Sequence, residues 1–541
     1  MAAHIKRTIM PSSLALFSLL QNCGFTRIYL RFLLLGLLIL SPLRARAGSC
    51  EDLSSFTLPD TTITLSEHVR AGEFALSSKG VPSQLASSTA AATGRNADLS
   101  DLPAFCLVAA NVKTSSDSAI KIEVWLPEKP VWNRKFLAHG WAFYAGTMNP
   151  AILAGPLRAG YATATTDGGG PAGNASFLLG HPEKIVDWGE RAWHETTIKS
   201  KAIMAAYYGM AATFSYWNGD GGAARQGLKE IQRFPSDYDG VALGGLAGDS
   251  SHFAFAQMWV WLAAHKDESS FIPPSKLPVI HQAALKTCNA APAGVRRGVI
   301  QDPEHCKFDP SVLLCRGTDG PNCLTESQVA AVRRIYEPVT NSQTKKKIFG
   351  PYMPGSELAW GGALAPQPSG YAIDFFKYIV FHDSNWDYKS LNFDADVMRA
   401  EKVDPSVNAV DPDLTPFVKR GGKLLLYGGW NDTAIPPRAE TDYYRSVIAK
   451  MGGKTVKDSI RLFMVPGMGH FLGGNGPDTY DFDSQQIIEQ WRENGVTPEE
   501  IVAVHRTNGA KDGEMLVCPY PRVAKLKGSG DPDVPSNFAC N

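Results

Sequence analysis

One stretch, residues 213–245, limits the possible folds more than any other part of the 541-residue chain. It reads TFSYWNGDGGAARQGLKEIQRFPSDYDGVALGG. The β-branched and aromatic residues 213–217 predict a buried strand, and the glycine-rich run 218–222 predicts a tight turn. Residues 223–233 predict a helix that Phe234-Pro235 ends, and Val241-Ala242-Leu243 predicts the next buried strand. Strand, turn, helix and strand in this order indicate an α/β protein with a mostly parallel sheet.

A glycine-rich turn between a strand and a helix is where an α/β-hydrolase carries its nucleophile, usually within G-x-S-x-G. This stretch resembles the corresponding turn of the tannase and feruloyl esterase family, which typically reads N-G-C-S-x-G-G-R-Q-x-L and then E-x-Q-R-F-P-x-D-Y-D-G. The positions that match without a gap are Asn218, Gly219, Arg225, Gln226, Leu228, Glu230, Gln232, Arg233, Phe234, Pro235, Asp237, Tyr238, Asp239 and Gly240. The resemblance implies an α/β-hydrolase fold and a lineage of carboxylic ester hydrolases acting on phenolic or aromatic acid esters.

The resemblance also implies a domain organisation. We expect residues 48–248 to form the first part of the hydrolase domain and residues 393–541 to form the second part. Between them, in residues 249–392, the alternation of strands and helices breaks down, and cysteines, prolines and aromatic residues gather. In the family such a segment is a lid over the active site, so we predict an inserted lid domain here.

The reactive atom of the family is missing. The family's nucleophilic serine falls on Gly221, which has no side-chain oxygen, and glycine tolerates the strained backbone of such a turn. The family's neighbouring cysteine falls on Asp220, and the cysteine that follows the catalytic histidine falls on Phe471. The family joins these two cysteines in a disulfide, and this chain lacks both, which indicates coherent divergence.

Two later blocks correspond to the other members of a catalytic triad. The block at residues 428–437 places the family's acid on Asp432, and the block at 466–471 places its catalytic histidine on His470. The order nucleophile, acid, histidine is that of α/β-hydrolases. Without these flanking blocks, the two residues would be interpreted as unrelated surface residues. With them, we expect a hydrogen-bonded pair of Asp432 and His470.

The loop that should supply oxyanion donors is also altered. The family's G-x-G-N-G-G-F-A-G falls on residues 138–146, which read AHGWAFYAG. Trp141 replaces the asparagine, and Ala142 and Phe143 replace the next two glycines. Side chains at positions of close backbone approach oppose a donor loop open to a substrate oxyanion.

Three interpretations of the turn follow. In the first, the chain is a catalytically silent relative that keeps the fold, the lid and a pocket for aromatic ligands. In the second, it is a hydrolase with displaced chemistry, in which Asp220 attacks as a carboxylate or His470 activates water. The commoner role of Asp220 would be to cap the following helix. In the third, residues 218–223 bind an anion, which Asp220 and the missing Lys-Ser/Thr of a phosphate loop oppose.

The N-terminus and the cysteines indicate export. Residues 1–47 combine basic residues, an apolar run at 32–40 and an A-x-A site at 45–47, which predicts a signal peptide and a secreted or periplasmic protein. Eight cysteines remain beyond it, and an even number in an exported chain suggests four disulfides. Local spacing suggests, and the family also implies, the pairs Cys50–Cys106, Cys288–Cys306, Cys315–Cys323 and Cys518–Cys540, although sequence does not prove connectivity. A metal site would be the alternative, but no C-x-x-C pair is present.

We expect a small aromatic ester or acid as ligand and no cofactor. The 53 basic and 53 acidic residues balance, so nothing in the charge favours a nucleic acid or a membrane surface as partner. The family carries a calcium loop of the type C-D-x-L-D-G-x-x-D-G-V-I. Here its acidic positions fall on Asn289, Ala293 and Arg297, so we predict that this calcium site is lost.

Overall fold

The computed structural model of the chain describes residues 48–541 except 75–98, 142, 145, 147, 172, 289–294, 297, 471–479, 508–509 and 532–533. The predicted signal peptide, residues 1–47, lies outside the described residues. Residues 47–541 form one compact unit. No helix in the described part is long and apolar enough to cross a membrane.

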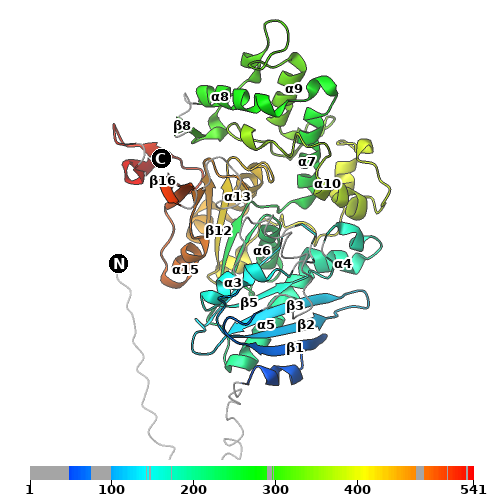
Figure 1. Cartoon of the computed structure of the whole chain (residues 1–541), viewed down its shortest axis with the longest axis vertical. Coiled ribbons are helices and arrows are strands. Elements are labelled where there is room, and N and C mark those ends of the chain that lie inside the picture. Colours follow the sequence, from blue (N-terminus) through cyan, green and yellow to red (C-terminus); the bar gives the residue numbers. More distant parts are fainter. Residues whose placement is uncertain are drawn as a thin grey trace, which may run out of the picture. The chain divides into compact units, whose positions relative to one another are not determined.

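A nine-stranded sheet organises the unit (Figure 1). Its strands, in spatial order, are β1 (Thr61–Val69), β2 (Phe105–Val112), β3 (Ile120–Pro127), β5 (Ala162–Thr166), β4 (Lys135–His139), β6 (Phe214–Asp220), β7 (Gly240–Gly244), β12 (Lys423–Gly429) and β13 (Ile460–Val465). Pairing is antiparallel from β1 to β5 and parallel from β5 to β13. The predicted α/β fold with a mostly parallel sheet is therefore confirmed.

Helices cover both faces of the parallel part. Every residue of β7 and β13 is buried, as expected for parallel strands between two helical layers. Successive residues of β12 point to opposite faces: Leu424 and Leu426 join the core that includes α5, α6 and α13, whereas Leu425 and Tyr427 join the core that includes α15. The helices on the described chain outside the insertion are α3 (Pro150–Arg158), α4 (Pro182–Val186), α5 (Ala192–Tyr208), α6 (Gly222–Arg233), α13 (Arg438–Met451), α14 (Gly453–Ser459) and α15 (Ser484–Asn494).

A long segment separates β7 from β12, and its described residues add no strand to the central sheet. In Figure 1 its helices α8 and α9 lie at the top, far from strands β1 to β3 at the bottom. The segment contains α7 (Ser250–Ala264), α8 (Leu277–Cys288), α9 (Glu326–Ile335), α10 (Gly370–Asp374), α11 (Asp396–Ala400), α12 (Thr415–Lys419) and the paired short strands β8 (Val295–Arg296) with β9 (Val299–Ile300) and β10 (Val339–Thr340) with β11 (Lys347–Phe349).

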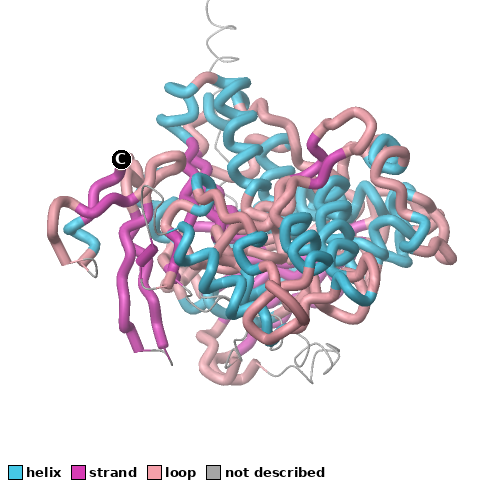
Figure 2. Tube along the Cα trace, turned by 90° about the horizontal axis from the view of Figure 1, so that it is seen from above, coloured by secondary structure: helices cyan, strands magenta, loops and turns pink. Residues whose placement is uncertain are grey.

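The C-terminal part forms small antiparallel sheets. Strands β14 (Tyr480–Asp481), β15 (Ile501–Thr507) and β16 (Ala510–Val517) form one sheet, and β17 (Ala524–Leu526) pairs with β18 (Phe538–Cys540). Figure 2 shows the β15–β16 ribbon beside the C-terminus. β14 precedes α15 and the other four strands follow it, and none of the five belongs to the main sheet.

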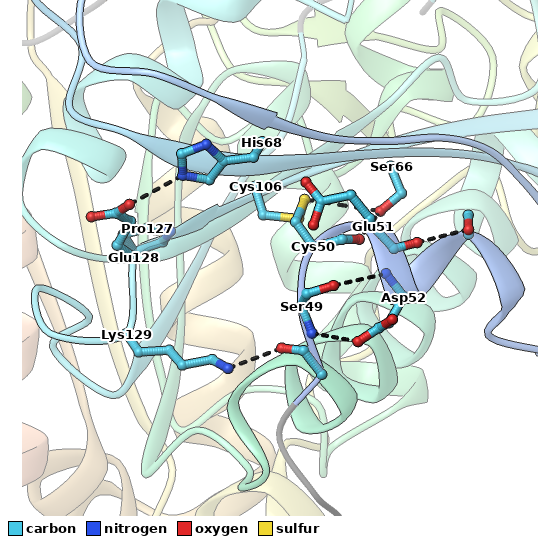
Figure 3. Close-up of a disulfide and its surroundings, with 12 residues drawn as sticks. Ser49, Cys50, Glu51, Asp52, Ser66, His68, Cys106, Pro127, Glu128 and Lys129 are labelled. Atoms are coloured by element: carbon cyan, nitrogen blue, oxygen red, sulfur yellow. Dashed lines mark hydrogen bonds and ion pairs between the residues drawn. A yellow bond between two sulfur atoms is a disulfide. The ribbon is translucent and has the colours of Figure 1, made fainter.

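Four disulfides join the pairs Cys50–Cys106, Cys288–Cys306, Cys315–Cys323 and Cys518–Cys540, which are the predicted pairs. Figure 3 shows the first one, which ties the start of the described chain to β2. Near it, Lys129 donates to the carbonyl oxygen of Gly48 at 2.9 Å, and Ser49 donates its amide to Asp52 at 2.8 Å. These contacts anchor the N-terminal end of the unit to the sheet.

Candidate active site

The turn between β6 and α6 is tighter than the sequence suggests. We predicted a turn over residues 218–222, but β6 continues to Asp220 and α6 begins at Gly222. The strand is longer because Tyr216 to Asp220 pair with Gly240 to Gly244 of β7. Gly221 alone makes the turn, with φ of 60° and ψ of −116°. Its amide donates to Gly244 O at 2.9 Å, which fixes this conformation.

The predicted acid and histidine lie together at the carboxyl ends of β12 and β13. His470 Nδ1 is 2.8 Å from Asp432 Oδ2. Asp432 is 1% exposed, and its other oxygen accepts the amides of Ala434 and Ile435, each at 2.8 Å. The carboxylate is thus held by backbone donors on one side and orients the imidazole on the other.

The imidazole faces the position of the missing side chain. A Cβ placed on Gly221 would lie 3.0 Å from His470 Nε2 and 3.3 Å from its Cε1. The next nearest atom would be Ile435 Cδ1 at 3.9 Å. The three positions that the sequence predicts as nucleophile, acid and base therefore come together, with no oxygen where a serine would carry it.

The charge balance at His470 favours its protonated form. Burial alone would lower the pKa of the imidazole, but the neighbouring Asp432 carboxylate more than offsets it, and the charge of Asp220 adds to the effect. The pKa of His470 is therefore raised above its ordinary value of 6.5. An imidazole of this kind can accept and return a proton near neutral pH.

Asp220, the speculative alternative nucleophile, lies at the end of β6. Its Oδ1 accepts a hydrogen bond from the Tyr427 hydroxyl at 2.8 Å. The same oxygen would lie 2.1 Å from a Cβ placed on Gly244, so the side chain packs closely against the adjacent strand β7. Burial and the Asp220 charge raise the pKa of Tyr427 well above its usual range, which keeps its hydroxyl a donor.

The altered loop after β4 is fixed to α6. Trp141 donates its amide to Gln226 Oε1 at 3.1 Å and accepts from Gln226 Nε2 at 3.0 Å. The indole Nε1 donates to Thr166 O at 2.8 Å. Phe143 follows with φ of 58° and an exposed ring. The Trp141 amide is thus engaged by Gln226 and does not point into an open oxyanion site.

Several predicted features lie outside the described residues. These are Phe471, Ala142 and the calcium-loop positions Asn289, Ala293 and Arg297. Sequence reasoning did not assign roles to Gln226 and Tyr427. Gln226 is one of the positions that match the family, which is the signal that could have identified it. Tyr427 belongs to an apolar strand, and nothing in that pattern indicates a partner for Asp220.

The sheet order, the turn at Gly221 and the paired Asp432 and His470 at strand ends define a protein of the α/β-hydrolase class. Residues 106–541 match the family described as tannase and feruloyl esterase. The chain belongs to this family.

Individual relatives agree with this assignment. An uncharacterized esterase of Xanthomonas campestris pv. campestris is 36% identical over an alignment 545 positions long, gaps included, which covers 91% of each chain. Feruloyl esterase B of Aspergillus niger is 29% identical over 456 residues, covering 80% of this chain and 86% of the relative. The crystal structure of feruloyl esterase B from Aspergillus oryzae superposes with a TM-score of 0.80 at 26% identity, covering 91% of this chain and 99% of that one.

Proposed function

We propose that the chain is an exported member of the family that has lost the serine-esterase reaction and binds a small aromatic ester or acid. One observation carries the proposal: His470 Nε2 faces Gly221, so the base is aimed at a residue without an oxygen. Acyl transfer by a serine requires an Oγ that attacks the ester carbonyl and gives its proton to the imidazole. Gly221 cannot form the covalent intermediate.

A second feature opposes the same reaction. A tetrahedral oxyanion is stabilised by N–H groups aimed at it, and removal of one donor costs about 100- to 1,000-fold in rate. Gln226 already accepts the amide of Trp141 in the loop that would supply such a donor. Because Gln226 is also the residue of the family's motif, this contact supports the proposal only together with the bulky residues Trp141 and Phe143 of the loop.

The ligand can enter a cavity between the inserted segment and α13. Its volume is 240 Å³, and its lining includes Leu246, Ile348, Phe349, Lys347 and Arg438. Leu246 follows Gly245, and a Cβ on Gly245 would lie 3.1 Å from the His470 ring. The lining of the cavity does not include His470 or Gly221, and Leu246 is the lining residue that lies next to Gly245 in the chain. The apolar side chains of the cavity suit an aromatic ring. Its two basic side chains already pair with carboxylates, Lys347 with Asp442 at 2.6 Å and Arg438 with Glu304.

The intact acid and base favour one alternative, a hydrolase in which His470 activates water. Nε2 would take a proton from water as the hydroxide adds to the ester carbonyl, and the departing alcohol would receive that proton. Asp432 would orient the ring through the bond to Nδ1. The attack by Asp220 as a carboxylate is less favoured, because Tyr427 and β7 hold that side chain against the sheet.

Two further parts of the proposal rest on the sequence. The predicted signal peptide and the four disulfides support export to a secreted or periplasmic location, because disulfides persist in oxidising compartments. We also propose that the family's calcium site is lost, since Asn289, Ala293 and Arg297 replace its acidic positions.

The test is hydrolysis of gallate, ferulate and nitrophenyl esters by residues 48–541, alongside calorimetric titration with ferulic and gallic acids. We expect no ester cleavage above the buffer rate and saturable binding of an aromatic acid. Cleavage that His470→Ala removes would establish the water mechanism instead. If Asp220→Ala removes the cleavage and His470→Ala does not, the carboxylate route is correct. Absence of both cleavage and binding would overturn the proposed ligand class.

A further inference from the structure

A second cluster of ionisable side chains lies away from the candidate active site. It consists of His194 on α5, Glu230 near the end of α6 and Asp237 in the loop that leads to β7. Helix α6 begins next to the turn at Gly221, and Glu230 lies about 12 Å further along this helix. The cluster is therefore separate from Asp432 and His470.

Glu230 is the unusual member. It is 0% exposed, and no N–H or hydroxyl group of a described residue donates to its carboxylate oxygens. Its side-chain hydrogen-bond contact is with the Asp237 carboxyl group. Burial, reinforced by the charge of Asp237, raises the pKa of Glu230 well above its ordinary range. A buried carboxylate without donors is costly, so a native structure usually supplies it with a proton shared with a neighbour or with a cation.

The other two side chains converge on Glu230. His194 Nδ1 is 2.8 Å from Asp237 Oδ2, and one ligand atom from each of the three side chains lies within 4.8 Å of the others. Phe234 stacks on the imidazole with ring centroids 3.6 Å apart, which holds the plane of His194. Lys201 donates to the backbone carbonyl of Asp237, and the charges of Asp237 and Glu230 act on its ammonium group.

We propose that His194, Glu230 and Asp237 bind a divalent transition-metal ion of the zinc type. One imidazole nitrogen and two carboxylate oxygens are donors that Zn²⁺ accepts at about 2.0–2.2 Å, with a fourth position for water. Zinc binding would require the three ligand atoms, which lie within 4.8 Å of one another, to converge on the ion. His194 is partly exposed, with 25% of its side chain accessible, so an ion can reach the cluster from solvent.

The ion would be structural. It would join α5, α6 and the start of β7, and so fix the far end of the helix whose first residue follows Gly221. The proposal is independent of the proposed ligand binding, since none of the three residues lines the cavity beside α13.

The cysteines of the mature chain do not compete for the ion. The other convergent group among the described residues is Cys315, Asp319 and Cys323, but its two sulfurs form a disulfide. The remaining six cysteines are also paired. Metal that binds to the folded chain can therefore be assigned to histidine and carboxylate ligands.

The test uses untagged residues 48–541, stripped with a chelator and loaded with one equivalent of zinc chloride. Zinc content after gel filtration and the midpoint of thermal unfolding are measured for the parent, Glu230→Gln and His194→Gln. We expect the parent to keep one zinc ion and to melt at a higher temperature with zinc. Each variant should bind at least 10- to 100-fold more weakly, which is the loss that outer-shell partners alone produce.

His252→Gln is the matched control. His252 contacts Asp249 through Nδ1 at 2.9 Å and Glu401 through Nε2 at 3.2 Å, so its two acids lie at opposite ring edges and cannot share one ion. This variant should keep the zinc. The proposal is overturned if the parent binds no zinc or if both site variants retain it. A proton shared between Glu230 and Asp237 would then explain the buried carboxyl group. If Glu230→Gln does not fold, the partly exposed His194→Gln decides the matter.

Discussion

The hydroxyl group of Tyr427 donates a hydrogen bond to Asp220 Oδ1 at 2.8 Å. Asp220 immediately precedes Gly221, the glycine that faces the imidazole of His470. The family resemblance predicts a cysteine at the position of Asp220, where this chain has a carboxylate. That charge contributes to the raised pKa of His470, after the contribution of Asp432. Gly221 offers no side-chain oxygen to His470, and the Asp220 carboxylate next to it adds a negative charge.

The carboxylates of Asp432 and Asp220 should raise the pKa of His470 by different amounts. We expect Asp220→Asn to lower the pKa of His470 and Asp432→Asn to lower it further, because Asp432 contributes both its charge and a direct hydrogen bond. Titration of the imidazole by NMR, assigned with His470→Gln, measures both shifts. Tyr427→Phe is the control, since it removes the hydroxyl and keeps the charge. A larger shift for Tyr427→Phe than for Asp220→Asn would contradict the electrostatic explanation.

Restoring the serine should cost stability and return little activity. At φ of 60° any side chain on Gly221 is strained, and its Cβ would lie 3.0 Å from His470 Nε2. We expect Gly221→Ser and Gly221→Ala each to lower the free energy of unfolding by about 1–3 kcal/mol. Ester hydrolysis by Gly221→Ser should stay near background, because Gln226 holds the Trp141 amide.

Chemical unfolding and a nitrophenyl ester assay check these expectations. Gly221→Ala separates the effect of the Cβ from that of the hydroxyl. Strong hydrolysis by Gly221→Ser alone would show that oxyanion donors are available despite the Trp141–Gln226 contact, and that a single substitution separates this chain from an active esterase.

The sequence predicted the frame of the site better than its contacts. Glycine spacing and flanking strands place Gly221, because the turn depends on local chain geometry. The pair of Asp432 and His470 was predicted from the family resemblance of the blocks around them, since its hydrogen bond joins two separate loops. The predicted end of β6 was wrong by three residues, because pairing with β7 extends the strand to Asp220. The hydrogen bond from Tyr427 joins β12 to the end of β6, and no local pattern encodes a contact across strands.

The disulfides should differ in their contribution to the free energy of unfolding, because they close loops of different length. Cys50 and Cys106 are 56 residues apart, whereas Cys315 and Cys323 are 8 apart. By chain entropy, replacing the first pair with alanine should cost about 4 kcal/mol and replacing the second about 2.5 kcal/mol. Denaturant unfolding of the two double variants measures the difference. Equal losses, or a larger loss for the short loop, would contradict this account.

Glu440 is a buried carboxyl group near Asp432, and the pH dependence of stability can test whether it is protonated in the folded protein. It is 1% exposed, Oε1 accepts the Leu246 amide at 2.6 Å, and Oε2 has no partner among the described residues. Burial and the charge of Asp432 raise its pKa well above the ordinary 4.5. A raised folded-state pKa means that the folded protein keeps a proton that the unfolded chain releases. The contribution of Glu440 to the free energy of unfolding is therefore fully present below pH 4.5, and it is lost as the pH rises toward the pKa of Glu440 in the folded protein.

Glu440→Gln removes this loss, because the amide keeps the shape and an acceptor for Leu246 but carries no proton to release. We expect the variant to gain stability over the parent by about 1.4 kcal/mol per pH unit above 4.5, up to the folded pKa of Glu440. Urea unfolding at pH 5 and pH 8 measures the gain. Glu499→Gln is the control: its partner Arg461 lowers the pKa of Glu499 despite partial burial, so its effect should be the same at both pH values. If the difference between Glu440→Gln and the parent is also constant, Glu440 is ionised in the folded protein and the Asp432 site holds a second buried negative charge.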